Sequence, residues 1–308
     1  MLLFALPEAH DIGAPLAQAL NTTLAPLEVR SFEDGEFKLR PLTPVRDADI
    51  YVVQSLHSAD GLSVHDRLCR LLFFMSVLRD HGAARITVIC PYLCYGRKDR
   101  RTKPFDPLTL RYVAQIIEAT GCDRLMTLEA HNVMAFQNAF RCETLHLEMA
   151  TVFVGEIARD LADKPLCVMS PDPGGIKRAQ LFREALETEL GEPVEFAFRD
   201  KRRSGGIRTS GAFAGDVAGK RVIIVDDMIV SGGTLLSSAR AALEFGAYEC
   251  VAVAAHGFFA QGSETLFETP ELSRVMVSDS VSTARATGAH IVSGIPALAS
   301  WLQELTQA

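Results

Sequence analysis

Short apolar runs alternate with segments of helical periodicity along the first half of the chain. Two runs rich in aliphatic residues cover 49–56 and 85–93, and their length and composition fit buried strands. Each is followed by a segment whose apolar positions recur about every three to four residues, at 67–82 and 108–121, as on one face of a helix. This order predicts strand-helix-strand-helix units around a parallel sheet.

The second half of the chain repeats this alternation. Its segments cover, in order, 151–162, 165–172, 176–191, 194–201, 220–228, 235–247 and 249–257. The length of 308 residues suits two domains, given roughly 100–200 residues per domain. We therefore expect two α/β domains, 1–147 and 148–308, each with a mostly parallel sheet flanked by helices. Pattern alone places the boundary, because no low-complexity linker marks it.

Composition and charge narrow the class of protein. A net charge of −7 does not suit a chain whose main partner is nucleic acid, so local basic clusters are read as sites. Seven cysteines without a C-x-x-C pair offer no zinc motif and fit a reduced, cytoplasmic protein. The apolar start MLLFALPEAH lacks a basic region and is expected to be a strand, not a signal peptide. No run reaches the ~18 apolar residues of a membrane helix, so we expect no membrane partner.

The segment VIIVDDMIVSGGT (222–234) combines an apolar strand, paired carboxylates and a glycine-rich turn. The strand should deliver Asp226 and Asp227 to the carboxyl edge of the sheet, where open α/β sheets bind ligands. The following turn leads into a helix, so its amides can approach an anion. The candidate phosphate cradle consists of Val230, Ser231, Gly232, Gly233 and Thr234. The alternative is a plain turn capped by Ser231 or Thr234.

This segment resembles the ribose-phosphate loop of type I phosphoribosyltransferases and of ribose-phosphate pyrophosphokinases, also called PRPP synthetases. The resemblance implies phosphoribosyltransferase-like α/β domains. Further segments favour the pyrophosphokinases. One of them, SFEDGEFKLRP (31–41), resembles their adenine-nucleotide segment, with Glu33 in place of a serine. The implied nucleotide-binding residues are Phe32, Asp34, Gly35 and Glu36. An exposed Asp-Gly turn is the alternative reading.

Two more segments resemble nucleotide-binding parts of the family. PYLCYGRKDRRTKPFDPLT (91–109) holds five basic residues from Arg97 to Lys103, and such a concentration in an acidic chain favours an anion site. The implied nucleotide-binding residues are Arg97, Lys98 and Asp99. Lys98 stands where the family usually has glutamine, which leaves the nucleotide preference open. In TLEAHN (127–132), His131 is implied to lie near nucleotide and magnesium, although a structural role is as plausible for a lone histidine.

The remaining segments concern the diphosphate. SPDPGGIKRAQ (170–180) resembles the family's pyrophosphate loop, formed here by Asp172, Gly174 and Gly175. The resemblance implies Mg²⁺ as cofactor, with His131 and Asp172 as its protein ligands. RDKRRSGG (199–206) resembles a segment whose Lys201 and Arg203 would point the same way on an extended chain. Both are implied catalytic residues, and Arg203 is also an implied ribose-phosphate contact.

The resemblance implies transfer of the diphosphoryl group of ATP to O1 of ribose 5-phosphate by a homo-oligomer. The family's commonest members carry an acid, a candidate general base, where this chain has Val230. Valine cannot remove a proton, so either O1 is deprotonated otherwise or activity is lost. Two alternatives stay open: a phosphoribosyltransferase that consumes the diphosphate, and a catalytically silent subunit that binds active synthetases.

Overall fold

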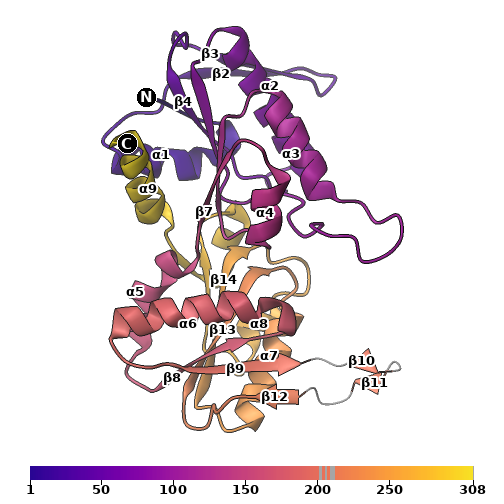
Figure 1. Cartoon of the computed structure of the whole chain (residues 1–308), viewed down its shortest axis with the longest axis vertical. Coiled ribbons are helices and arrows are strands. Elements are labelled where there is room, and N and C mark those ends of the chain that lie inside the picture. The colour runs from indigo at the N-terminus through magenta and orange to yellow at the C-terminus, as the bar shows by residue number, and fades with distance from the viewer. Residues whose placement is uncertain (201–202, 205–206, 209–211, 308) are drawn as a thin grey trace. The chain divides into compact units, whose positions relative to one another are not determined.

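The computed structural model describes residues 1–200, 203–204, 207–208 and 212–307 (Figure 1). Two compact units are present. The first comprises Met1–Leu147 with Ser280–Ser282 and the C-terminal segment from Ile295, and the second comprises Glu148–Asp279 with Thr283–Gly294. The expected domains, 1–147 and 148–308, stay a prediction, but the helix at the end of the chain belongs to the first unit.

A five-stranded parallel sheet forms the centre of the first unit, in the order β1-β4-β5-β6-β7. Its strands are β1 (Leu2–Ala5), β4 (Asp49–Val53), β5 (Arg85–Ile89), β6 (Arg124–Leu128) and β7 (Glu143–Leu147). In β4, four consecutive residues from Ile50 to Val53 are fully buried. Such continuous burial fits a parallel sheet with helices on both faces. The helices are α1 (His10–Ala19), α2 (Val64–Asp80), α3 (Thr109–Ala119), α4 (Val133–Ala139) and α9 (Ile295–Gln307).

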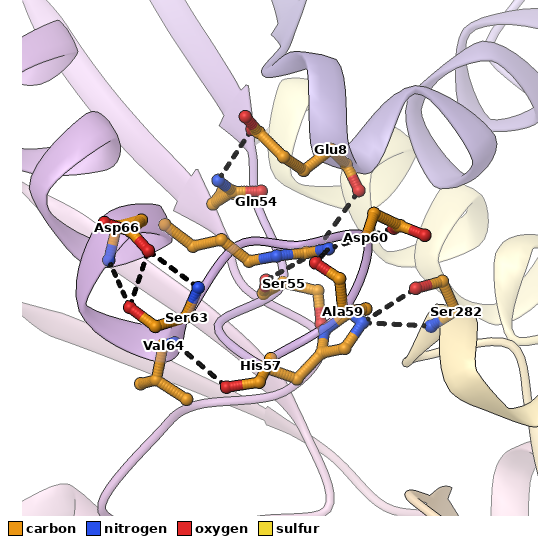
Figure 2. Close-up of polar contacts among 12 residues, drawn as sticks. Glu8, Gln54, Ser55, His57, Ala59, Asp60, Ser63, Val64, Asp66 and Ser282 are labelled. Carbon is orange, nitrogen blue, oxygen red and sulfur yellow. Dashed lines mark hydrogen bonds and ion pairs between the residues drawn. The ribbon is translucent and has the colours of Figure 1, made fainter. Parts of the chain in front are cut away.

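Helix α2 begins three residues before the predicted start of 67. Ser63 is its N-cap and forms a capping box with Asp66, which satisfies amides that the first turn leaves without a helical partner. A separate antiparallel hairpin, β2 (Leu27–Ser31) with β3 (Phe37–Pro41), also belongs to the first unit. The short segment Ser280–Ser282 is anchored there, because Ser55 Oγ donates to Ser280 O at 2.6 Å. His57 Nε2 also lies 2.9 Å from Ser282 Oγ (Figure 2).

The second unit has a seven-stranded sheet in the order β12-β9-β8-β13-β14-β15-β16, parallel except for the edge pair β12–β9. The strands are β8 (Leu166–Ser170), β9 (Glu195–Asp200), β12 (Ala212–Ala214), β13 (Arg221–Ile229), β14 (Glu249–Gly257), β15 (Arg274–Ser278) and β16 (His290–Val292). Its helices are α5 (Ala150–Leu161), α6 (Ile176–Leu190), α7 (Gly233–Glu244) and α8 (Thr265–Glu268). A short pair, β10 (Arg203–Ser204) and β11 (Ile207–Arg208), lies outside this sheet. The predicted α/β class with mostly parallel sheets is confirmed.

This topology gathers the candidate segments at sheet edges. Parallel strands end at the same edge, so neighbouring strands bring the loops that follow them together. In the first unit, β5 and β6 are neighbours and lead into the segments at 91–99 and 129–132. In the second unit, β9, β8 and β13 are consecutive neighbours. Within the described ranges, no helix is both long and apolar enough to cross a membrane.

Candidate functional site

The paired carboxylates lie within strand β13, which continues to Ile229. Asp227 is 4% exposed, and its amide donates to Asp226 Oδ1 at 2.9 Å. Burial raises the pKa of Asp226 to about 7, and the neighbouring charge of Asp227 adds to this effect. The strand begins and ends one residue later than predicted, so both acids lie inside it, with Asp226 half-buried and Asp227 buried. Two close carboxylates in this setting can accept hydrogen bonds from sugar hydroxyls or bind a cation.

Arg178 is a site residue that the sequence reasoning missed. It stands in the first turn of α6, and its Nη1 lies 3.9 Å from Asp226 Oδ1 and 3.8 Å from Asp227 Oδ1. A cation in the first turn of a helix is opposed by the helix dipole, so an arginine at this position needs another anionic partner. That signal was available in the sequence. Arg178 offsets part of the repulsion between the two acids.

The glycine-rich turn after β13 has two glycines with different surroundings. Gly232 has φ +75° and is the N-cap of α7, and a Cβ built on it would lie 2.2 Å from Leu266 Cδ1. Gly233 has no heavy atom within 4 Å of such a Cβ. The first amides of a helix have no partner inside the helix. Gly232 is therefore packed against Leu266, whereas the space beside Gly233 is open. The amides at the start of α7 can bind an anion in that space.

In the candidate pyrophosphate loop, the side chain of Asp172 accepts hydrogen bonds from the backbone amides of the same loop. Asp172 Oδ1 accepts from the amides of Gly174 at 2.9 Å and Gly175 at 3.1 Å, and Ser170 Oγ donates to Asp172 O at 2.7 Å. The carboxylate therefore occupies the two amides that the sequence reasoning assigned to diphosphate. For these amides to bind another anion, the Asp172 side chain must turn away.

The segment RDKRRSGG (199–206), with the candidate catalytic residues Lys201 and Arg203, begins at the end of β9. Lys201 lies outside the described residues, and of Arg203 the structure describes the backbone in β10. Arg199 is a second residue that the sequence reasoning missed. Its Nη1 donates to Ser237 O at 2.7 Å and to Ser237 Oγ at 2.9 Å, and Ser237 Oγ donates to Thr234 O at 3.0 Å. Arg199 thus ties the end of β9 to the first turns of α7, which carries the phosphate cradle.

In the first unit, the structure brings together two of the candidate nucleotide segments. Arg97 and Lys98 are exposed, whereas the side chain of Asp99 is only 5% exposed and accepts from Asn132 Nδ2 at 2.8 Å. A Cβ built on Gly96 would lie 3.8 Å from His131 Cβ. The two cations therefore lie beside the loop that carries His131. Asp99 is occupied in holding these segments together.

The third nucleotide segment forms the tip of the β2–β3 hairpin. Asp34 Oδ1 accepts from the amide of Glu36 at 3.0 Å, and Gly35 takes φ +91° in the turn. The Phe32 ring is 39% exposed, with the Arg30 guanidinium 4.9 Å above it. Figure 1 shows this tip apart from the loop between β5 and α3. Within the described first unit, the tip residues and the exposed cations are therefore not brought together.

A preformed metal centre is absent from the described part of the chain, which has no group of three His, Cys, Asp or Glu side chains that could hold an ion. His131 belongs to the first unit and Asp172 to the second. Mg²⁺ keeps several waters and needs few protein ligands, so this finding leaves the assignment of His131 and Asp172 a prediction.

Comparisons with known proteins agree over nearly the whole chain. A family model for the N-terminal domain of ribose phosphate pyrophosphokinase matches residues 1–121, and one for the phosphoribosyl synthetase-associated domain matches 208–292. A ribose-phosphate pyrophosphokinase of Ureaplasma parvum is 32% identical over 309 residues, covering 98% of this chain and 90% of that relative. The crystal structure of phosphoribosylpyrophosphate synthetase from Mycobacterium smegmatis matches with a TM-score of 0.88 and 28% identity, covering 99% of this chain and 98% of that one.

Proposed function

Because the chain belongs to the ribose-phosphate pyrophosphokinase family, whose members are diphosphotransferases of nucleotide biosynthesis, we propose that it transfers the diphosphoryl group of ATP to O1 of ribose 5-phosphate. The products are 5-phosphoribosyl 1-diphosphate and AMP. The observation that carries this proposal is one edge of the second unit's sheet. The acidic pair lies near the end of β13 and the α7 cradle follows it, while the pyrophosphate loop follows the adjacent β8 and the segment with Lys201 follows β9, next to β8.

In this proposal the second unit binds the acceptor. Asp226 and Asp227 fix the ribose hydroxyls, and the amides from 230 to 234 hold the 5-phosphate. Arg97 and Lys98 bind the nucleotide phosphates, since an exposed guanidinium can fork onto phosphate oxygens. Transfer of phosphoryl groups depends on positioning and on compensation of charge. Lys201 and Arg203 supply that compensation at the diphosphate.

The donor set fits magnesium. Two adjacent carboxylates, one with its pKa raised to about 7 by burial and by the other's charge, gain from a nearby cation. Hard oxygen donors are the ligands that Mg²⁺ prefers. His131 and Asp172 are the further ligands in this proposal. When bound, Mg²⁺ neutralises charge on the transferred diphosphate.

The proposal places the enzyme in the cytoplasm. All seven cysteines are free, which supports a reducing compartment.

The proposal also includes association of the chain with copies of itself. Phe73 on α2 is 58% exposed and stacks on Phe37 at 5.6 Å between ring centroids, and Ile116 on α3 is 48% exposed. Exposed apolar side chains of this size on two helices of the first unit support association with further copies of the chain.

Formation of AMP tests the reaction directly. We expect AMP from ATP, Mg²⁺ and ribose 5-phosphate, and a fall in rate of about 100-fold or more in Lys201→Ala, because the variant loses a charge aimed at the transition state. Coupled enzymatic detection of AMP gives both rates. No AMP above the Lys201→Ala background would reject the proposal. Formation of nucleotide from the diphosphate and a free base would favour a phosphoribosyltransferase, and neither activity would favour the silent subunit.

Replacing Val230 tests the missing acid. Val230 is 37% exposed at the start of the cradle, so an aspartate fits without displacing the core. We expect kcat of Val230→Asp to rise by about tenfold, since a positioned general base contributes at least that much. Val230→Asn has the same shape without the acid and should leave kcat at the level of the unmodified enzyme. Equal kcat values in all three proteins would remove this position from the proton-transfer step.

A further inference from the structure

Tyr95 has an unusual backbone conformation directly before the exposed cations Arg97 and Lys98. Its φ is +62°, in the left-handed region that bulky side chains rarely adopt. Such a conformation persists only where surrounding contacts fix it. The Tyr95 hydroxyl lies 2.5 Å from Nε2 of His65, and the two rings are 6.1 Å apart between centroids. His65 therefore contributes a contact that fixes Tyr95.

His65 stands on a turn that is itself anchored. Ser63 and Asp66 close the capping box at the start of α2, and the amide of Val64 donates to Ser58 Oγ at 3.1 Å (Figure 2). One turn further, the fully buried Arg67 donates to the carbonyls of Ser55 and Ala59, each at 3.4 Å. The loop after β4 and the first turns of α2 thus form one bonded body. This body does not depend on the His65 side chain.

The segment from Tyr95 to Asp99 is also held at its far end. The amide of Lys98 donates to Tyr95 O at 3.1 Å, and Lys98 O accepts from the amide of Leu110 at 3.3 Å. Asp99 is bonded to Asn132, as described above. With both ends fixed, the positions of Arg97 and Lys98 are set by the geometry of a single turn. The side chains of both cations remain exposed to a ligand.

We propose that His65 is a positioning residue for the polyphosphate chain of the nucleotide substrate. By holding the Tyr95 hydroxyl, it keeps the turn at 95–98 in the conformation that presents Arg97 and Lys98 together. This inference rests on the proposed function, because it takes that turn to be the nucleotide-binding segment. His65 acts through Tyr95, so its loss should weaken nucleotide binding without affecting the acceptor.

The test compares the KM values for ATP and for ribose 5-phosphate, with the melting temperature. In His65→Ala and in Tyr95→Phe we expect the KM for ATP to rise about fivefold, as the loss of one hydrogen bond allows. The KM for ribose 5-phosphate and the melting temperature should stay near their original values. The double variant should be no worse than either single one, because both remove the same bond. His65→Gln should recover ATP affinity, since its amide can still bond the hydroxyl.

His81→Ala is the matched control. His81 is the C-cap at the other end of α2 and bonds Val77 O, so its loss should leave both KM values unchanged. An unchanged KM for ATP in His65→Ala and Tyr95→Phe, in an enzyme that makes AMP, overturns this inference and leaves the proposed function intact. If no AMP forms, the Kd for ATP from calorimetry replaces the KM. Failure of the unmodified protein to bind ATP overturns both.

Discussion

Gly232→Ala is expected to lower the free energy of unfolding by about 3 kcal/mol and to abolish binding of ribose 5-phosphate. A left-handed conformation costs an alanine roughly 1–2 kcal/mol, and overpacking a core adds about 1–3 kcal/mol. Both costs apply, because Gly232 has φ +75° and its added Cβ would lie 2.2 Å from Leu266 Cδ1. Leu266 is 1% exposed in the core of the second unit and has little room to move. Urea unfolding and the KM for ribose 5-phosphate measure the two effects.

Gly233→Ala separates packing from binding. Its Cβ meets no heavy atom within 4 Å, and alanine is preferred over glycine inside a helix by about 1 kcal/mol. We expect this variant to be at least as stable as the unmodified protein. If it nevertheless binds ribose 5-phosphate poorly, the open space at Gly233 is where the phosphate sits. Equal stability of the two alanine variants would contradict the account of Gly232.

Asp226→Asn is expected to stabilise the protein at pH 8 while removing its use of ribose 5-phosphate. The pKa of Asp226 is about 7 in the folded chain, against an ordinary value of 3.8, because burial and Asp227 disfavour its charge. Stability is therefore highest below the ordinary value and falls as the pH rises through about 7. At pH 8 the folded protein carries the full cost of the buried charge. Asparagine keeps the acceptor for the Asp227 amide and lacks the charge.

The expected gain for Asp226→Asn is about 2 kcal/mol at pH 8 and much less at pH 5, where the folded unmodified protein already holds the proton. Urea unfolding at both pH values gives the difference. The same titration predicts that the unmodified enzyme loses affinity for ribose 5-phosphate as the pH falls below 7. A gain of equal size at both pH values would show that Asp226 is ionised at pH 5, and would contradict the raised pKa.

Periodicity predicted most strands and helices because their burial follows local sequence. The segments at 176–191 and 249–257 became α6 and β14 almost residue for residue. The start of α2 was missed because its first turn holds the exposed residues His65 and Asp66 and is fixed by the capping box of Ser63, not by an apolar face. The place of α9 in the first unit depends on contacts distant in sequence. No local pattern contains that information.

In the candidate site, too, the sequence predicted the features that lie within one segment but not those that depend on contacts between segments. Motifs predicted which loops carry acids, glycines and cations, because each loop is one continuous stretch. Sequence could not show that Asp172 bonds its own loop, since that depends on a side-chain rotation. Arg199 and His65 were missed because their partners, Ser237 and Tyr95, are each about 30 to 40 residues away. Their bonds exist only once the sheet order has brought these elements together.

The C-terminal helix has a consequence for how the protein is made. Helix α9 contacts α1, and both belong to the first unit, so the second unit is in effect an insertion within the first. On the ribosome, Glu148–Asp279 emerges and can fold before α9 has been synthesised. Until then α1 lacks the contacts that α9 makes with it in the finished fold. The first unit begins synthesis earlier but completes its core later, which makes a chaperone most useful at that stage.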